Sequence, residues 1–116
     1  MAAYVDGFLL PVRKNKIAEY KKMARLGRKI WLEYGALDYH ECIADDAKPG
    51  KLTSFPQSVD MQPGETVLVA VVTYRSRAHR DEVNAKAMAD KRMGGLDPKA
   101  MPFDPRRMFW GGFKPF

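Results

Sequence analysis

The sequence predicts an α+β fold in which two helices cover one face of a four-stranded antiparallel sheet. Strand-like and helical apolar patterns follow one another along the 116 residues in the order β-α-β-β-α-β. Residues 16–34 carry an apolar residue every three or four positions, as a helix with one buried stripe requires. Residues 67–73 form an apolar strand without alternation. A chain of this length supports one core, so we expect a single domain over residues 1–116.

The first strand is expected over residues 4–12, which are rich in aromatic and aliphatic side chains. The first helix follows over residues 16–34. Asn15 is its expected N-cap, and Gly35 suits the left-handed conformation that often follows the last turn. These signals predict the first β-α pair.

The second strand is expected over residues 36–43. Its period of two places Asp38, His40 and Cys42 on one face. Residues 45–64 contain several Pro and Gly turn signals, so they predict a long connection with little regular structure. A loop of this length in a compact domain often has a function or forms an interface.

The third strand, residues 66–74, is apolar on both of its faces. One face carries Val67, Val69 and Val71, and the other carries Leu68, Ala70 and Val72. Leaving three valines in water would forgo about 1.5–3 kcal/mol each. That sum rivals a total domain stability of roughly 5–15 kcal/mol. Both faces of this strand must therefore be covered.

Ser76 is the expected N-cap of the second helix, which runs to about residue 90 and is ended by Gly94 and Gly95. Residues 96–106 are a connection interrupted by prolines. The fourth strand is expected over residues 107–113. Its paired glycines predict either a bulge or a close approach of the backbone to a neighbour.

This order of elements is the split βαβ pattern of ferredoxin-like folds, with both helices on one face of the sheet. The other face is left bare. A two-fold homodimer that pairs these bare faces is the simplest cover. The alternative is that residues 45–64 fold back over the bare face.

Short motifs spread over nearly the whole chain carry a family resemblance. They are residues 4–8, 54–56, 74–81, 84–86, 101–104 and 111–113. The chain resembles the bacterial domain of unknown function family 1428, the YbaA-like proteins. The resemblance implies a dimeric α/β-barrel architecture, shared with small monooxygenases and haem-degrading enzymes. It implies no catalytic residue, and monooxygenase-like chemistry follows by fold analogy only.

His40 is the first candidate for chemistry, with Asp38 and Cys42 beside it on the strand. This trio would present an imidazole, a carboxylate and a thiol to one cavity, where they could bind a transition metal or move protons. The alternative is a hydrogen-bonded histidine at the barrel face or dimer seam, with Cys42 as a small buried apolar residue. The spacing matches no known metal-ligand pattern, so we expect no metal.

Two further groups are candidate ligand-binding residues. His79, Arg77 and Arg80 lie at the start of the second helix and could hold an anion; the alternative is a capping region whose charges pair with one another. Trp31 and Tyr34 could line a pocket for a flat apolar molecule between helix and sheet. The alternative for these two is an ordinary core stripe.

The net charge of +6 is uneven, because residues 1–34 and 67–116 are basic and residues 35–66 are acidic. A basic stripe on the first helix comprises Lys21, Lys22, Arg25, Arg28 and Lys29. It could contact the phosphates of RNA or another polyanion. It lacks interleaved aromatics and any recognition motif, so a solvated face is the alternative and nucleic acid is not the expected partner.

The remaining expectations concern location and function class. The sequence shows no signal peptide and no apolar run that could span a bilayer, and its lone cysteine fits a reducing cytoplasm. We expect a cytoplasmic homodimer without a cofactor. Three function classes stay open: binding of a small aromatic or anionic molecule, binding of a polyanion, and a structural or regulatory dimer with no pocket.

Overall fold

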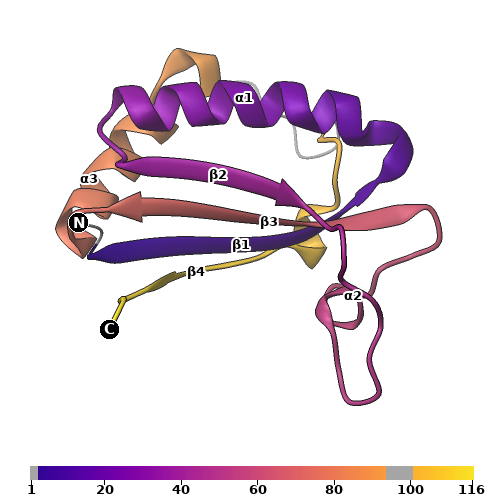
Figure 1. The fold of residues 1–116 in the computed structure, drawn as a ribbon. Coiled ribbons are helices and arrows are strands. Elements are labelled where there is room, and N and C mark those ends of the chain that lie inside the picture. The colour runs from indigo at the N-terminus through magenta and orange to yellow at the C-terminus, as the bar shows by residue number, and fades with distance from the viewer. Residues whose placement is uncertain (1–2, 94–100) are drawn as a thin grey trace.

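The computed structural model describes residues 3–93 and 101–116 and consists of one antiparallel sheet with two long helices on one face (Figure 1). The strands are β1 (Tyr4–Arg13), β2 (Asp38–Ile43), β3 (Glu65–Tyr74) and β4 (Phe109–Phe113). The helices are α1 (Ile17–Glu33), α2 (Phe55–Ser58) and α3 (Arg77–Met88). Short 3₁₀ turns occupy Lys14–Lys16, Lys91–Met93 and Pro105–Arg107. The predicted helix end at Gly94 and Gly95 lies outside the described residues.

The strand order is β2-β3-β1-β4, and every neighbouring pair is antiparallel. β1 and β3 pair along their full length, from Tyr4 opposite Tyr74 to Arg13 opposite Glu65. β3 lies between β1 and β2, and β1 lies between β3 and β4. Each of the long helices α1 and α3 therefore crosses one strand, and both lie over the same face of the sheet.

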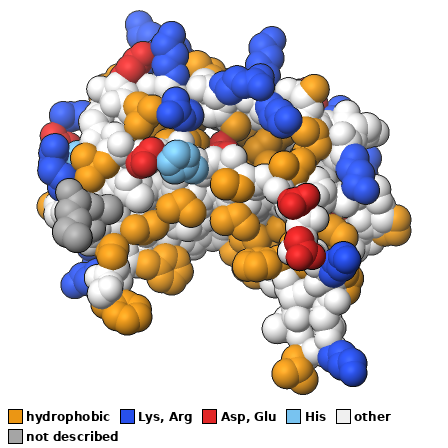
Figure 2. Space-filling view, viewed as in Figure 1, with side chains coloured by type: hydrophobic (Ala, Val, Ile, Leu, Met, Phe, Trp, Pro, Cys, Tyr) orange, Lys and Arg blue, Asp and Glu red, His pale blue; other side chains and the backbone are white. Residues whose placement is uncertain are grey.

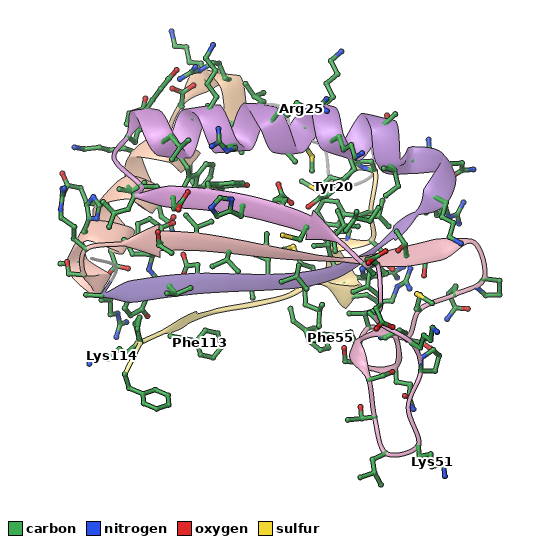
Figure 3. The ribbon with its side chains drawn as sticks, in the orientation of Figure 1. Tyr20, Arg25, Lys51, Phe55, Phe113 and Lys114 are labelled. Atoms are coloured by element: carbon green, nitrogen blue, oxygen red, sulfur yellow. The ribbon has the colours of Figure 1, made fainter. Side chains whose placement is uncertain are left out.

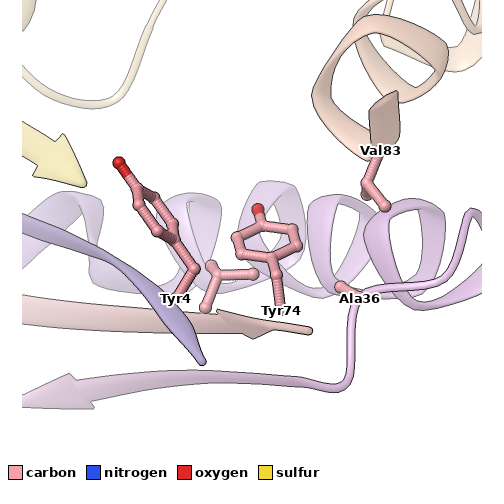
Figure 4. Close-up of a cluster of buried hydrophobic side chains, with 5 residues drawn as sticks. Tyr4, Ala36, Tyr74 and Val83 are labelled. Atoms are coloured by element: carbon pink, nitrogen blue, oxygen red, sulfur yellow. The ribbon is translucent and has the colours of Figure 1, made fainter. Parts of the chain in front are cut away.

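The core fills the space between the sheet and the two long helices. One cluster joins β1, β3 and α3 and contains Tyr4, Ala36, Val72, Tyr74 and Val83 (Figure 4). A second cluster under α1 contains Leu10, Val12, Tyr20 and Leu68. The strand residues in these clusters alternate along β1 and β3, and the α1 residues recur at helical spacing, as the sequence predicted.

The helix boundaries confirm two predicted signals and correct a third. Gly35 has a φ of +112°, and the Ser76 side chain accepts a hydrogen bond from the His79 N–H at 3.0 Å. The predicted Asn15 cap was wrong: Asn15 lies inside the 3₁₀ turn, and Lys16 is the N-cap without a side-chain bond. The chain enters α1 through this tighter turn, which moves the cap position by one residue.

The glycine pair in β4 makes a close approach and no bulge. The pairing of β4 with β1 continues without interruption through Gly111 and Gly112. A Cβ atom on Gly112 would lie 2.1 Å from the Tyr4 hydroxyl oxygen, so this position has no room for a side chain. The strand is shorter than predicted, because residues 105–107 form a turn in place of its start.

Residues 44–64 form an arm that projects below one end of the sheet, on the side away from the long helices (Figure 1). The prediction of little regular structure missed the short helix α2, which Ser54 caps by accepting from the Gln57 N–H. Val59 of the arm and Val67 of β3 are both nearly inaccessible to solvent. Val69 and Val71 are only partly covered. The arm thus covers one end of this face and leaves the rest open.

Candidate functional site

The face of the sheet that carries no long helix, here called the open face, is largely apolar. Strand pairing assigns to it Val5, Gly7 and Leu9 of β1, Val69, Val71 and Thr73 of β3, Phe109, Gly111 and Phe113 of β4, and Asp38, His40 and Cys42 of β2. Phe109 and Phe113 are 49% and 63% exposed. With Phe55 of the arm they border a shallow hollow of about 290 Å³. Figure 3 shows Phe55 and Phe113 below the sheet, opposite α1.

Asp38, His40 and Cys42 share the open face, as their spacing predicted. The His40 Nε2 atom lies 2.9 Å from Asp38 Oδ1, and both side chains are more than half exposed. Cys42 is exposed, so the expectation of a buried apolar cysteine was wrong. The reason is that β2 is an edge strand, and none of the described helices lies over it on this side. No cluster of three or more metal-ligating side chains occurs within residues 3–93 and 101–116.

The second predicted group, at the start of α3, does not converge on one point. His79 accepts a hydrogen bond at Nδ1 from the Arg75 N–H at 3.0 Å. Arg77 lies 3.9 Å from Asp81 on the exposed side of the helix. Arg80 points the other way, into the core. The structure therefore separates the two arginines that were expected to share an anion.

Arg80 forms a buried ion pair with Asp6 of β1. Its Nη1 donates to Asp6 Oδ1 at 2.8 Å and its Nη2 donates to the Tyr4 hydroxyl at 3.3 Å. Asp6 is only 1% exposed. Burial raises the pKa of Asp6 above its ordinary value, and the Arg80 guanidinium opposes that rise. The charge of Arg80 is thus paired with Asp6 inside the protein.

Trp31 and Tyr34 connect α1 to α3 and the segment that follows it. The Trp31 indole N–H donates to Asn84 Oδ1 at 2.9 Å, and the Tyr74 hydroxyl donates to the same oxygen at 3.2 Å. The Tyr34 hydroxyl donates to Asp90 Oδ2 at 2.8 Å. These side chains have polar partners and pack against the first core cluster. Their role in binding a ligand stays a prediction.

A cleft between α1 and β2, here called the α1/β2 cleft, was not identified from the sequence. Its volume is about 320 Å³. Its lining includes Tyr20, Lys21, Ala24, Arg25, Arg28, Tyr39, His40, Glu41, Ile43 and Leu68. Glu41 is half-buried and accepts hydrogen bonds from the Tyr20 and Tyr39 hydroxyls. Burial raises the pKa of Glu41, and burial beside this carboxylate also raises the pKa of both tyrosines.

A sequence signal for this cleft was present but unspecific. Glu41 lies two residues from both Tyr39 and Ile43, so all three share the face of β2 that is turned toward α1. A charged residue in an otherwise apolar alternation often marks a buried polar group. The sequence does not show that Tyr20 of α1 reaches the same carboxylate. Figure 3 shows Tyr20 between α1 and the sheet.

A larger recess of about 600 Å³ lies beside residues 101–107. Four of its charged side chains, Glu65, Asp104, Arg106 and Arg107, pair with one another, and its lining also includes Arg13 and Lys16. Arg107 makes two hydrogen bonds to Glu65, at 2.7 and 2.8 Å, and both Arg106 and Arg107 contact Asp104. The two arginines of residues 101–107 are thus already paired with carboxylates inside the protein.

The comparisons with known proteins point to one family. A family model described as "Protein of unknown function (DUF1428)" matches residues 3–105. "Uncharacterized protein YbaA" of Escherichia coli strain K12 is 40% identical over 111 residues, which are 96% of this chain and 94% of that protein. YbaA of Shigella flexneri matches with the same identity and coverage.

Two further findings concern fold and location. The de novo designed protein Foldit4 aligns with 97% of this chain and 98% of its own, at a TM-score of 0.49 and 9% sequence identity. A likeness of that size carries no argument about fold or function. In the described part of the chain, no helix has the length and apolar character needed to cross a membrane.

Proposed function

This chain belongs to the DUF1428 family, and from its own geometry we propose that it is a homodimer that binds a small aromatic or anionic molecule. In the proposed dimer, two ferredoxin-like subunits pair their open faces and together form a dimeric α/β barrel. The observation that carries the proposal is an apolar open face that the arm covers at one end only. Cofactors, membranes and nucleic acids have no part in the proposal.

The composition of the open face supports a protein partner. Among the residues of the open face named above, the ionisable ones are Asp38, His40 and Cys42, which all lie on the edge strand β2. Phe55, Phe109 and Phe113 are each about half exposed or more. Contiguous apolar patches of this kind are uncommon on monomers and mark interaction surfaces. Figure 2 shows hydrophobic side chains along the concave lower surface of the molecule.

The shape of the open face supports a second copy as that partner. A two-fold interface uses the same surface on both subunits, so a projection on that surface must fit a recess on the same surface. The arm is such a projection, and the hollow between Phe55 and Phe113 is such a recess. The four strands span roughly 500 Å² at usual strand spacings. The arm adds to this area, and stable dimers bury about 800 Å² per subunit.

The ligand part of the proposal is supported by the α1/β2 cleft. The cleft opens on the helix side of β2, so pairing through the open face does not use its α1 wall. It combines aromatic side chains, three cationic side chains and a half-buried carboxylate. Small-molecule sites commonly have such a mixture of apolar walls and a few polar groups.

The substitution Val71→Glu tests the proposal. Val71 lies in the middle of the open face. In the proposed dimer, a glutamate there would be buried without an opposite charge, which is energetically costly. Light scattering is expected to give twice the 13.2 kDa chain mass for the wild type and one chain mass for the variant. Leu26→Glu, on the exposed side of α1, is the matched control and should stay dimeric. A wild-type monomer, or a Val71→Glu dimer as stable as the wild type, would show the proposed interface to be wrong.

A further inference from the structure

The α1/β2 cleft has a polar end at its floor. The carboxylate of Glu41 accepts from the Tyr20 hydroxyl at one oxygen and from the Tyr39 hydroxyl at the other, the second at 3.4 Å. Tyr20 is 5% exposed, so this end of the cleft is well shielded. A carboxylate oxygen can accept two hydrogen bonds, so each oxygen keeps capacity for another donor. The floor can therefore receive a hydroxyl group of a ligand.

The rim of the cleft has the opposite character. Lys21, Arg25 and Arg28 lie three or four residues apart and so share one side of α1. Within the part of the chain that the structure describes, none of the three forms an ion pair with a carboxylate. Arg28 Nε donates to the Tyr39 carbonyl oxygen at 3.1 Å, which fixes its guanidinium beside β2. Two arginines at one rim suit the planar, bidentate recognition of a carboxylate.

The cleft also has an apolar wall. Ala24, Ile43 and Leu68 belong to the same lining as the three cationic side chains and Glu41. The volume of about 320 Å³ suits a single aromatic ring with its substituents. An inorganic anion would leave this apolar wall unused, and an anion at the floor would meet the charge of Glu41.

From this arrangement we propose that the α1/β2 cleft binds a small hydroxylated aromatic carboxylate. Its carboxylate lies against Arg25 and Arg28, its ring lies on Ala24, Ile43 and Leu68, and its hydroxyl donates to Glu41. The inference rests on the ligand part of the proposed function and names the place and class of that ligand. It does not depend on the dimer, because the residues that carry it come from one chain.

The test is a titration of the full chain with 4-hydroxybenzoate, followed by calorimetry and by backbone amide shifts. The wild type is expected to bind saturably, with the largest shifts in residues 39–43. The double variant Arg25→Gln, Arg28→Gln should bind roughly tenfold more weakly or worse, because charge-assisted hydrogen bonds are lost. The matched control, Lys22→Gln with Lys29→Gln, removes the same charge from α1 outside the cleft and should change affinity by less than about twofold. Neutral 4-hydroxybenzamide and inorganic phosphate should both bind roughly tenfold more weakly than the carboxylate.

Several results would overturn the inference. An equal loss of affinity for 4-hydroxybenzoate in both double variants would indicate diffuse attraction to the basic side of α1. A polyanion would bind by the same kind of attraction. Shifts confined to the open face would place the ligand elsewhere and contradict the cleft while agreeing with the broader proposal. The absence of saturable binding to a folded wild-type chain would contradict the ligand class. A monomeric mass in light scattering would contradict the dimer alone and leave this titration valid.

Discussion

Asp6 and Arg80 illustrate how single residues set the packing of this protein. Three of the motifs that carry the family resemblance meet at this pair: residues 4–8 supply Tyr4 and Asp6, residues 74–81 supply Arg80, and residues 111–113 supply Gly112. Gly112 leaves the space that the Tyr4 hydroxyl needs to reach Arg80. Residues distant in sequence thus depend on one another at one buried point.

Arg80→Ala tests the weight of this buried pair. The variant leaves the Asp6 carboxyl buried without its cation, which typically costs about 3–5 kcal/mol. Urea unfolding at neutral pH should show a loss of that size. Arg77→Ala, on the exposed side of the same helix, should change the free energy of unfolding by less than about 0.5 kcal/mol. Equal effects of the two substitutions would mean that the buried pair contributes little.

At the scale of elements, the turn before β4 is attached to β3 by Glu65 and Arg107. Glu65 is 7% exposed and accepts two hydrogen bonds from Arg107, at 2.7 and 2.8 Å. It also accepts from the Gln62 N–H. The hydrogen bonds from Arg107 are the main cause of a pKa of Glu65 below its ordinary value, and the Gln62 N–H adds to it. This contact positions the start of β4, an edge strand that pairs with β1.

The lowered pKa of Glu65 predicts a pH dependence of stability. A depressed pKa stabilises the fold above the ordinary carboxyl value and loses that effect as the pH falls through the folded pKa. Glu65→Gln should therefore lower the free energy of unfolding at pH 7 by about 1–3 kcal/mol. The difference from the wild type should shrink toward zero when both are unfolded by urea near pH 2. An equal difference at both pH values would contradict this role; Glu19→Gln, in an exposed pair, is the control.

The elements that the sequence predicts well are those with local signals. The apolar stripe of α1, Gly35 after its end and the Ser76 cap of α3 depend on neighbours within a turn or two. Two local features were missed because their sequence patterns are short. Asn15 lies inside a 3₁₀ turn instead of capping α1, and Ser54 caps a helix too short to leave a periodic pattern.

The candidate site divides in the same way. Strand parity placed Asp38, His40 and Cys42 on the open face, because alternation is a local property. The inward turn of Arg80 toward Asp6 crosses 74 positions of sequence, so its helix alone could not reveal it. The contact of Tyr20 with Glu41 likewise joins two elements whose packing the sequence pattern leaves open.

At the scale of the whole molecule, the sheet has two unequal sides. Two long helices and both core clusters lie on one side, and the arm lies on the other (Figure 1). The apolar residues of β3, which include Val67, Val69 and Val71, require that both faces of this strand be covered. The arm buries Val67 and leaves the other two partly exposed, so the requirement is met only in part. A second copy on the open face would complete it.

The most direct measurement of this central claim is an isotope-filtered NOE experiment on a mixture of labelled and unlabelled chains at micromolar or higher concentration. Only contacts between two chains give signals in this spectrum. We expect signals that involve the methyl groups of Val69 and Val71 and the rings of Phe109 and Phe113. A spectrum without interchain signals, or with signals from α1 alone, would contradict the pairing of open faces.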